Sequence, residues 1–122
     1  MLFRSADPNN TIATSFDGIN WTGRGITVFS IQGNGIIWNG VSWVAVGSGT
    51  NSTAYSYDGV NWTEGTNIFA GGGNDVFWNG KLMVAVGADP NNTIATSFDG
   101  ISWTGRGNGI FSTRGKIGRA HV

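Results

Sequence analysis

Short runs in which apolar and polar residues alternate occur throughout the chain, and each run ends at a segment rich in Gly, Asn, Asp or Ser. In the middle of the chain, the runs cover residues 35–38, 42–47, 53–57 and 61–64. Alternation with a period of two is typical of β-strands, and no segment keeps the 3.6-residue apolar period of a helix. The pattern predicts an all-β unit of four short antiparallel strands, with further strands at residues 11–16, 81–87 and 93–98.

The chain also repeats itself. Residues 6–25 return as residues 88–107 with a single change, Asn20 in the first copy and Ser102 in the second. A more divergent copy occupies residues 53–65. Equivalent aspartates therefore recur at a step of 41 residues, at Asp17, Asp58 and Asp99. A period of this length, in units that read as strands, predicts a β-propeller or a similar array.

Two Asn-Gly pairs stand at the ends of predicted strands. Asn39-Gly40 and Asn79-Gly80 each follow a tryptophan and precede an apolar run that ends in Val-Ala-Val-Gly. Asn-Gly is the strongest short-range signal for a hairpin, because both residues tolerate positive φ in a type I′ turn. We therefore expect Asn39, Gly40, Asn79 and Gly80 to form type I′ hairpin turns.

A second motif, Ser-x-Asp-Gly-x-x-Trp, marks each of the three repeats. Its members are Ser15, Asp17, Gly18 and Trp21; Ser56, Asp58, Gly59 and Trp62; and Ser97, Asp99, Gly100 and Trp103. The motif resembles the Asp-box of BNR-type repeats, which occur in sialidases and many other propellers, although it is one residue shorter between Asp and Gly. The resemblance implies a β-propeller fragment of about two and a half four-stranded antiparallel blades.

The chemistry of this motif is structural. An Asp at the start of a tight turn accepts hydrogen bonds from backbone N–H groups a few residues further on. Glycine supplies the positive φ of the turn, and the tryptophan packs into the sheet with its indole N–H bonded. Because the motif recurs in every unit, and catalytic residues are normally single, we expect turn-fixing aspartates rather than catalysts or calcium ligands. We also expect the three tryptophans to occupy equivalent buried places.

Composition excludes several classes of function. The chain has 21 glycines, six tryptophans, no cysteine and a net charge of zero. Disulfides and thiolate metal sites are therefore excluded, and no block of like charge suggests a nucleic-acid partner. No apolar run approaches the roughly 18 residues of a membrane span. The one histidine, His121, lies at the end of the chain, and no metal site or cofactor is expected.

Both ends of the chain differ from the repeats. Residues 1–5 and 116–122 resemble translated sequencing-adapter DNA, since CTC TTC CGA TCT encodes residues 2–5 and ATC GGA AGA GCA CAC GTC encodes residues 117–122. We expect these tails to join no sheet. Residues 6–115 are then an internal, partial propeller from a longer protein, and its exposed edges favour self-association.

Two functions remain open. The first is a non-catalytic binding or structural module that recognises a carbohydrate, a protein or a surface through loops at one end of the propeller. The second is a fragment of a sialidase-like glycoside hydrolase. The resemblance would then imply an arginine cluster and a Tyr/Glu pair with an Asp acid/base. Arg24 and Arg106 are repeat-equivalent and Glu64 stands alone, so such a catalytic set would lie outside this fragment.

Overall fold

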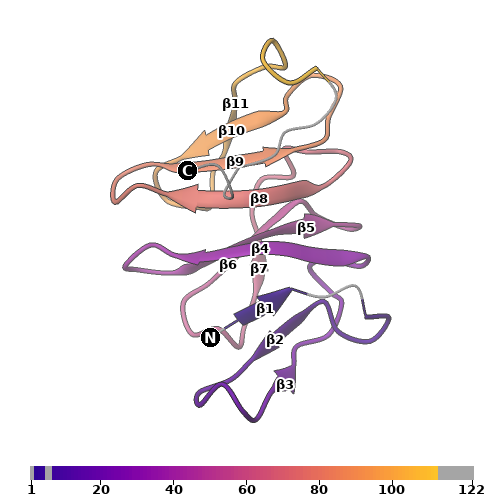
Figure 1. Cartoon of the computed structure of the whole chain (residues 1–122), viewed down its shortest axis with the longest axis vertical. Coiled ribbons are helices and arrows are strands. Elements are labelled where there is room, and N and C mark those ends of the chain that lie inside the picture. The colour runs from indigo at the N-terminus through magenta and orange to yellow at the C-terminus, as the bar shows by residue number, and fades with distance from the viewer. Residues whose placement is uncertain (1, 5–6, 113–122) are drawn as a thin grey trace.

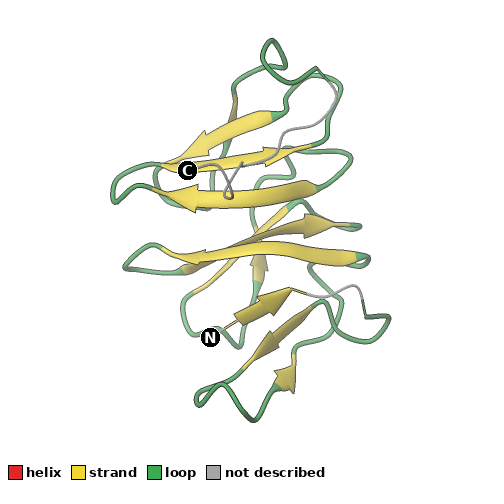
Figure 2. Ribbon diagram, in the orientation of Figure 1, coloured by secondary structure: helices red, strands yellow, loops and turns green. Residues whose placement is uncertain are grey.

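The computed structural model describes residues 2–4 and 7–112, and for residues 2–4 it describes the backbone only. In this part of the chain, eleven strands form three antiparallel sheets, and no helix is present (Figures 1 and 2). The prediction of an all-β fold is confirmed. No helix able to cross a membrane occurs in the described part.

The strands follow the chain from sheet to sheet without crossing over. The first sheet contains β1 (Leu2–Arg4), β2 (Ile12–Thr14) and β3 (Thr22–Gly23). The second contains β4 (Gln32–Trp38), β5 (Trp43–Ser48), β6 (Thr53–Ser56) and β7 (Thr63–Glu64). The third contains β8 (Gly73–Trp78), β9 (Met83–Gly87), β10 (Ile94–Ser97) and β11 (Thr104–Gly105).

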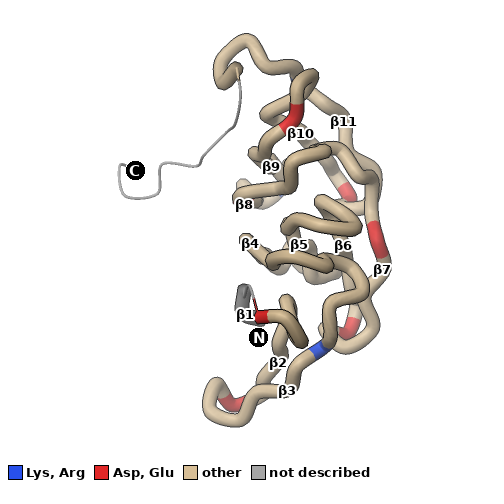
Figure 3. Tube along the Cα trace, turned by 90° about the vertical axis from the view of Figure 1, so that its right-hand side faces the viewer, with Lys and Arg blue, Asp and Glu red and all other residues tan. Residues whose placement is uncertain are grey.

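The three sheets lie one on another, with β1, β4 and β8 along the same side of the stack (Figure 3). One apolar core between the first and second sheets contains Ile12, Ala45 and Ala54. Another between the second and third sheets contains Val44, Val46, Met83, Ala85, Ala95 and Trp103. The small alanines at equivalent places let neighbouring sheets approach closely. Equivalent residues of successive repeats therefore pack between neighbouring sheets in the same way.

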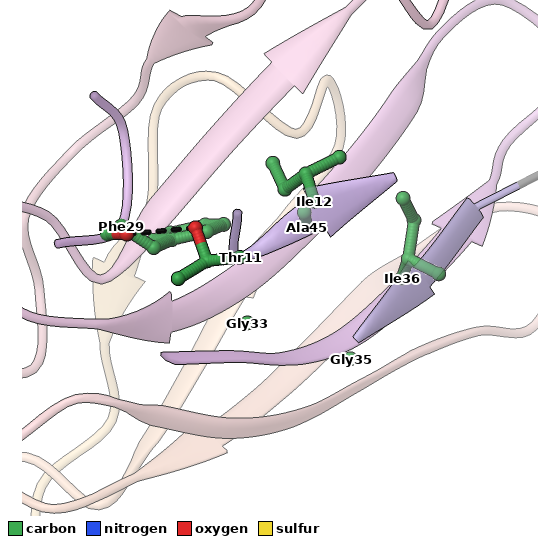
Figure 4. A pocket seen from close by; sticks show the side chains of 7 residues that line it. All are labelled: Thr11, Ile12, Phe29, Gly33, Gly35, Ile36 and Ala45. Atoms are coloured by element: carbon green, nitrogen blue, oxygen red, sulfur yellow. Dashed lines mark hydrogen bonds between the residues drawn. The ribbon is translucent and has the colours of Figure 1, made fainter. Parts of the chain in front are cut away.

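A buried phenylalanine lies in each connection between sheets. Phe29 packs against Gly47 of the second sheet, and Phe69 packs against Gly87 of the third. The backbone of each is held by a hydroxyl that lies directly before a strand of the preceding sheet, β2 in one case and β6 in the other. The Thr11 hydroxyl donates to the Phe29 carbonyl at 2.7 Å (Figure 4), and the Ser52 hydroxyl accepts from the Phe69 N–H at 3.1 Å.

The first of these junctions is tightly filled. The cavity among Thr11, Phe29 and their neighbours holds about 10 Å³ (Figure 4). This is at the lower limit for a single water molecule. The junction between the first and second sheets is therefore packed core rather than a binding site.

The expectation that residues 1–5 join no sheet is wrong, because β1 pairs antiparallel with β2. Its register is the one that β9 adopts against β10: Arg4 stands opposite Ile12 as Val86 stands opposite Ile94. Residues 6–11, between β1 and β2, have the same sequence as residues 88–93, between β9 and β10. The open edge of β2 pairs with the strand that lies beside it. The other predicted tail, residues 116–122, lies outside the described residues.

The expected type I′ hairpins are also corrected. Among the described residues only glycines adopt positive φ, which is 90° at Gly40 and 96° at Gly80. The asparagines before them do not, and the Oδ1 atom of each accepts two backbone N–H groups of its own turn, at 2.8 and 3.0 Å. A glycine of positive φ at the first central position, followed by a residue without it, fits a type II′ turn. The asparagine side chain thus caps the turn instead of occupying its centre.

Candidate binding site

The Asp58 turn is held by a closed set of short hydrogen bonds. Asp58 Oδ1 accepts the backbone N–H groups of Val60 and Asn61, both at 2.8 Å. The Ser56 hydroxyl donates to the same oxygen at 3.0 Å and accepts the Gly59 N–H at 2.8 Å. The Ser56 and Asp58 side chains, at the start of the tight turn, thus accept hydrogen bonds from its backbone N–H groups.

The tryptophan of the motif closes the turn from the other side. In all three turns the indole N–H donates to the carbonyl of the glycine three residues earlier, at 3.2 Å for Trp21, 3.0 Å for Trp62 and 3.3 Å for Trp103. The three glycines have φ of 76°, 80° and 78°. Three sequence-equivalent motifs therefore form three turns of the same geometry at a step of 41 residues.

The hydrogen bonds lower the pKa values of these aspartates. At Asp17 the backbone N–H of Asn20 does most to hold the pKa well below its ordinary value, followed by that of Ile19. The N–H groups of Asn61 and Val60 lower the pKa of Asp58 in the same way. At Asp99 the N–H of Ile101 lowers the pKa, and partial burial opposes it. All three stay ionised near neutral pH.

The single difference between the two twenty-residue copies changes the third turn. Asn20 Nδ2 donates to Asp17 Oδ2 at 2.8 Å, and Asn61 Nδ2 donates to Asp58 Oδ2 at the same distance. Ser102, at the equivalent place, donates only its backbone N–H, to Asp99 Oδ1 at 3.0 Å. Within the described residues no side chain other than Ser97 donates to the Asp99 carboxylate. Asp99 Oδ2 is thus left without the amide partner that both other turns supply.

The turns differ in their surroundings as well. A Cβ on Gly100 would overlap a methyl group of Val44 in the second sheet, whereas one on Gly18 would meet nothing within 4 Å. The expectation of equal burial for the three tryptophans is wrong: Trp103 is 5% exposed and Trp21 is 41% exposed. The turn of the third sheet is covered by the second sheet, and the turn of the first sheet is not covered in this way.

A groove of about 360 Å³ lies between the second and third sheets, at the end where the hairpin turns and Asp turns lie. We call it the inter-sheet groove. Its lining includes Asn39, Tyr57, Trp78, Lys81, Phe98 and Asp99. The volume falls within the roughly 300–1,000 Å³ of small-molecule sites, which combine apolar walls with a few polar groups.

The groove brings together residues from both predicted motifs. Asn39 and Gly80 come from the two hairpin turns, and Asp99 comes from the third Asp turn. The Asn39 amide is occupied, because its oxygen accepts from Val41 and Ser42 and its Nδ2 lies 3.8 Å from the Met83 sulfur. The Asp99 carboxylate and the exposed Lys81 ammonium remain as the charged groups of the groove.

Sequence reasoning missed the aromatic residues of this groove. Tyr57 and Phe98 are exposed and stand directly before the aspartates of their turns, as Phe16 does in the first turn. An aromatic residue occupies this place in all three copies, and exposed apolar side chains that gather in one patch mark a binding surface. Trp78 is half-buried and comes from the end of β8.

The remaining charges of residues 7–112 form no cluster that could hold a metal ion. Charged residues lie singly over the sheets (Figure 3). Among residues 7–112, no cluster of three or more His, Cys, Asp or Glu side chains could hold a metal ion. Comparison with protein-family models, with curated proteins and with solved structures found no match.

Proposed function

We propose that the three sheets are successive blades of a β-propeller and that the chain is a non-catalytic binding module, which holds a carbohydrate in the inter-sheet groove. The 41-residue period, the antiparallel sheets of three or four strands and their stacking in chain order support the propeller. The resemblance of the Asp turns to Asp-box repeats supports it independently, since both features are typical of propeller blades.

The inter-sheet groove supports the choice of ligand. Tyr57 and Phe98 present exposed aromatic surface that can stack on the apolar face of a sugar ring. Lys81 can donate hydrogen bonds to sugar oxygens, and the Asp99 carboxylate can accept from hydroxyl groups. Such a mixture of aromatic surface with a few directed polar groups binds a ring that has one apolar face and a polar rim.

The observation that carries this proposal is the environment of Asp99. Its carboxylate lines the groove, stays ionised, and lacks the amide that occupies Oδ2 in the two other turns. A hydrogen bond to a charged acceptor is worth about 1.5–3 kcal/mol. Ser102 in place of asparagine thus leaves a strong acceptor for a sugar hydroxyl at the one Asp turn whose aspartate lines the groove.

No observation on the described residues favours the glycosidase alternative. The resemblance to sialidases would imply an arginine cluster and a Tyr/Glu pair with an Asp acid/base, and the lining of the inter-sheet groove includes Tyr57 and Asp99 but no arginine and no glutamate. Arg24 and Arg106 each donate Nε to a strand threonine at 2.9 Å, Thr14 and Thr96 respectively. These two guanidinium groups hold neighbouring strands.

The test is a titration of the full chain with methyl glycosides of galactose, mannose and N-acetylglucosamine, followed by amide NMR shifts. We expect shifts at residues 98–102 and 80–81 with at least one of the three sugars. Ser102→Asn should weaken binding roughly tenfold or more, because the new amide occupies Asp99 Oδ2. The change restores the turn chemistry of the other repeats, so the fold should remain intact.

The matched control is Asn20→Ser, which makes the first turn identical to the third at a site away from the groove. It should leave the sugar-induced shifts unchanged. Absence of shifts with all three sugars in the unaltered chain, or equal affinity for Ser102→Asn, would contradict the proposed site.

A further inference from the structure

Two strands of the same sequence bury opposite faces. In β2, Ile12 and Thr14 are buried and Ala13 is half-exposed. In β10, the equivalent Ala95 is fully buried, and Ile94 and Thr96 are half-exposed. Because successive side chains of a strand point to opposite faces, β2 is covered by the second sheet on one face and β10 is covered by the second sheet on the other.

The face of the first sheet that is left open has a covered counterpart in the third sheet. Trp103 is 5% exposed and a Cβ on Gly100 would meet Val44 of the second sheet, whereas the equivalent Trp21 is 41% exposed and a Cβ on Gly18 would meet nothing within 4 Å. Ile19 follows the same rule, because it is 80% exposed and its equivalent Ile101 is half-buried. Every residue that differs in burial here belongs to the same twenty-residue sequence.

The opposite face of the third sheet also has a covered counterpart. Phe77 in β8 is 51% exposed, whereas the equivalent Ile37 in β4 packs against the core between the second and third sheets. Val84 in β9 is half-exposed, whereas the equivalent Val44 is fully buried under Gly100. The open face of the third sheet is therefore equivalent to the face of the second sheet that covers the third sheet.

We propose that a second copy of this chain docks its third sheet onto the first sheet, in the arrangement with which the second sheet covers the third. Val84 of one copy would then lie against Gly18 of the other, as Val44 lies against Gly100. Ala13 and Trp21 would become buried, as Ala95 and Trp103 are. The contact is head to tail, with two different surfaces, and such contacts generate rings when the rotation closes.

The number of copies follows from the proposed propeller. Two copies place six sheets in a ring, which lies within the usual range of about 4–8 blades, whereas three copies exceed it. We therefore expect a closed dimer in which both head-to-tail junctions form. The docking itself depends only on the matching faces, and the closed dimer rests on the proposed function.

The experiment measures molar mass by light scattering after size exclusion, over a range of concentrations. The unaltered chain should have twice the mass of one chain. Ala13→Arg places a long charged side chain on the open face of the first sheet, and Phe77→Asp places a charge on that of the third; each alone should be monomeric. If Ala13→Arg does not fold, Ile19→Glu takes its place, because it also puts a charge on the open face of the first sheet and should be monomeric. Thermal melts report whether each variant is folded.

The matched control is Phe16→Glu. Phe16 is 100% exposed, but its equivalent Phe98 remains 74% exposed in the covered third sheet, so this position takes no part in the junction. The control should remain dimeric. Mixing Ala13→Arg with Phe77→Asp restores one intact junction and should give a one-to-one complex, which a contact between two identical surfaces would not.

Three outcomes decide the matter. An unaltered chain that is monomeric at all concentrations overturns the docking, and so does a mixture of the two variants that forms no complex. Species whose mass grows with concentration and that the same variants abolish support the docking and overturn the closed ring. The sugar titration is independent of these results, so failure of the binding site and failure of the docking are distinguishable.

Discussion

Gly100 of the third sheet lies directly against Val44 of the second, so closely that a Cβ at Gly100 would overlap the valine methyl group. The equivalent Gly18 has a φ of 76°, against 78° at Gly100, but a Cβ at Gly18 would meet nothing within 4 Å. Adding a side chain to a glycine can lower the free energy of unfolding in two ways, by straining a left-handed backbone and by overlapping a neighbouring sheet. Comparison of Gly18 with Gly100 separates these two effects.

Replacing each glycine by alanine measures the two effects. Gly18→Ala should lower the free energy of unfolding by about 1–2 kcal/mol, because alanine resists the left-handed conformation. Gly100→Ala carries the same strain and should lose a further 1–3 kcal/mol or so from overpacking against Val44. Urea denaturation of dilute, monomeric samples would measure both values. Equal losses would contradict the packing role of Gly100.

The phenylalanine between the second and third sheets offers a direct test of the stacking. Phe69 is buried against Gly87, and its N–H donates to the Ser52 hydroxyl. Phe69→Ala should cost about 3–5 kcal/mol, because the removed ring leaves a cavity at the junction. Phe98→Ala removes an exposed ring and should change the free energy of unfolding by less than about 0.5 kcal/mol. Similar melting temperatures for the two variants would contradict the assigned core.

The Asp turns predict the response to acid. Their backbone hydrogen bonds hold the pKa values of Asp17, Asp58 and Asp99 below the ordinary value in the folded chain. The unfolded chain, with Asp pKa values of about 3.9, then binds protons first as the pH falls. This stabilisation is fully present above about pH 5 and is lost as the pH falls through the lowered values.

We therefore expect a melting temperature that is nearly constant from about pH 5 to 8 and declines below about pH 4. Asp58→Asn keeps an acceptor oxygen but removes the charge. It should lower the melting temperature at neutral pH and make the acid decline shallower. An acid decline of the same steepness in Asp58→Asn would show that the Asp58 carboxylate does not contribute to it.

Residues 1–5 provide a prediction about the first sheet. Because β1 has the register of β9, replacing residues 1–5 by the sequence of residues 83–87, Met-Val-Ala-Val-Gly, should be tolerated. Deleting residues 1–5 should destabilise the chain by about 1 kcal/mol for each backbone hydrogen bond lost from β2. Thermal melts would compare the two variants. A deletion that leaves the melting temperature unchanged would contradict a stabilising role of the β1–β2 pairing.

Much of the local structure could be predicted from the repeats. The strand runs, the place of each turn and the small residues between sheets all appear in the alternation and the 41-residue period. The hairpin type could not be predicted in this way. Asn39 and Asn79 tolerate positive φ as single residues, but in the fold their side chains accept turn N–H groups and the glycines alone take that conformation.

The candidate groove was only partly visible in the sequence. Asp99 belongs to a motif, and the change from Asn20 to Ser102 is visible in the two copies. Its consequence depends on the second sheet, because the groove exists only where Tyr57 and the Asn39 hairpin face Phe98 and Asp99 across a junction. The pattern of residues within one repeat does not predict which side chains of two different repeats lie side by side.

The sequence by itself determined the all-β composition, the repeat unit and the residues that form each turn, because these depend on contacts within a few residues. Only the tertiary structure decided the burial of Trp21 and Trp103 and the pairing of β1. Two copies of one sequence bury opposite faces because burial depends on which sheet lies alongside, and a strand edge pairs with whatever segment the loop brings to it.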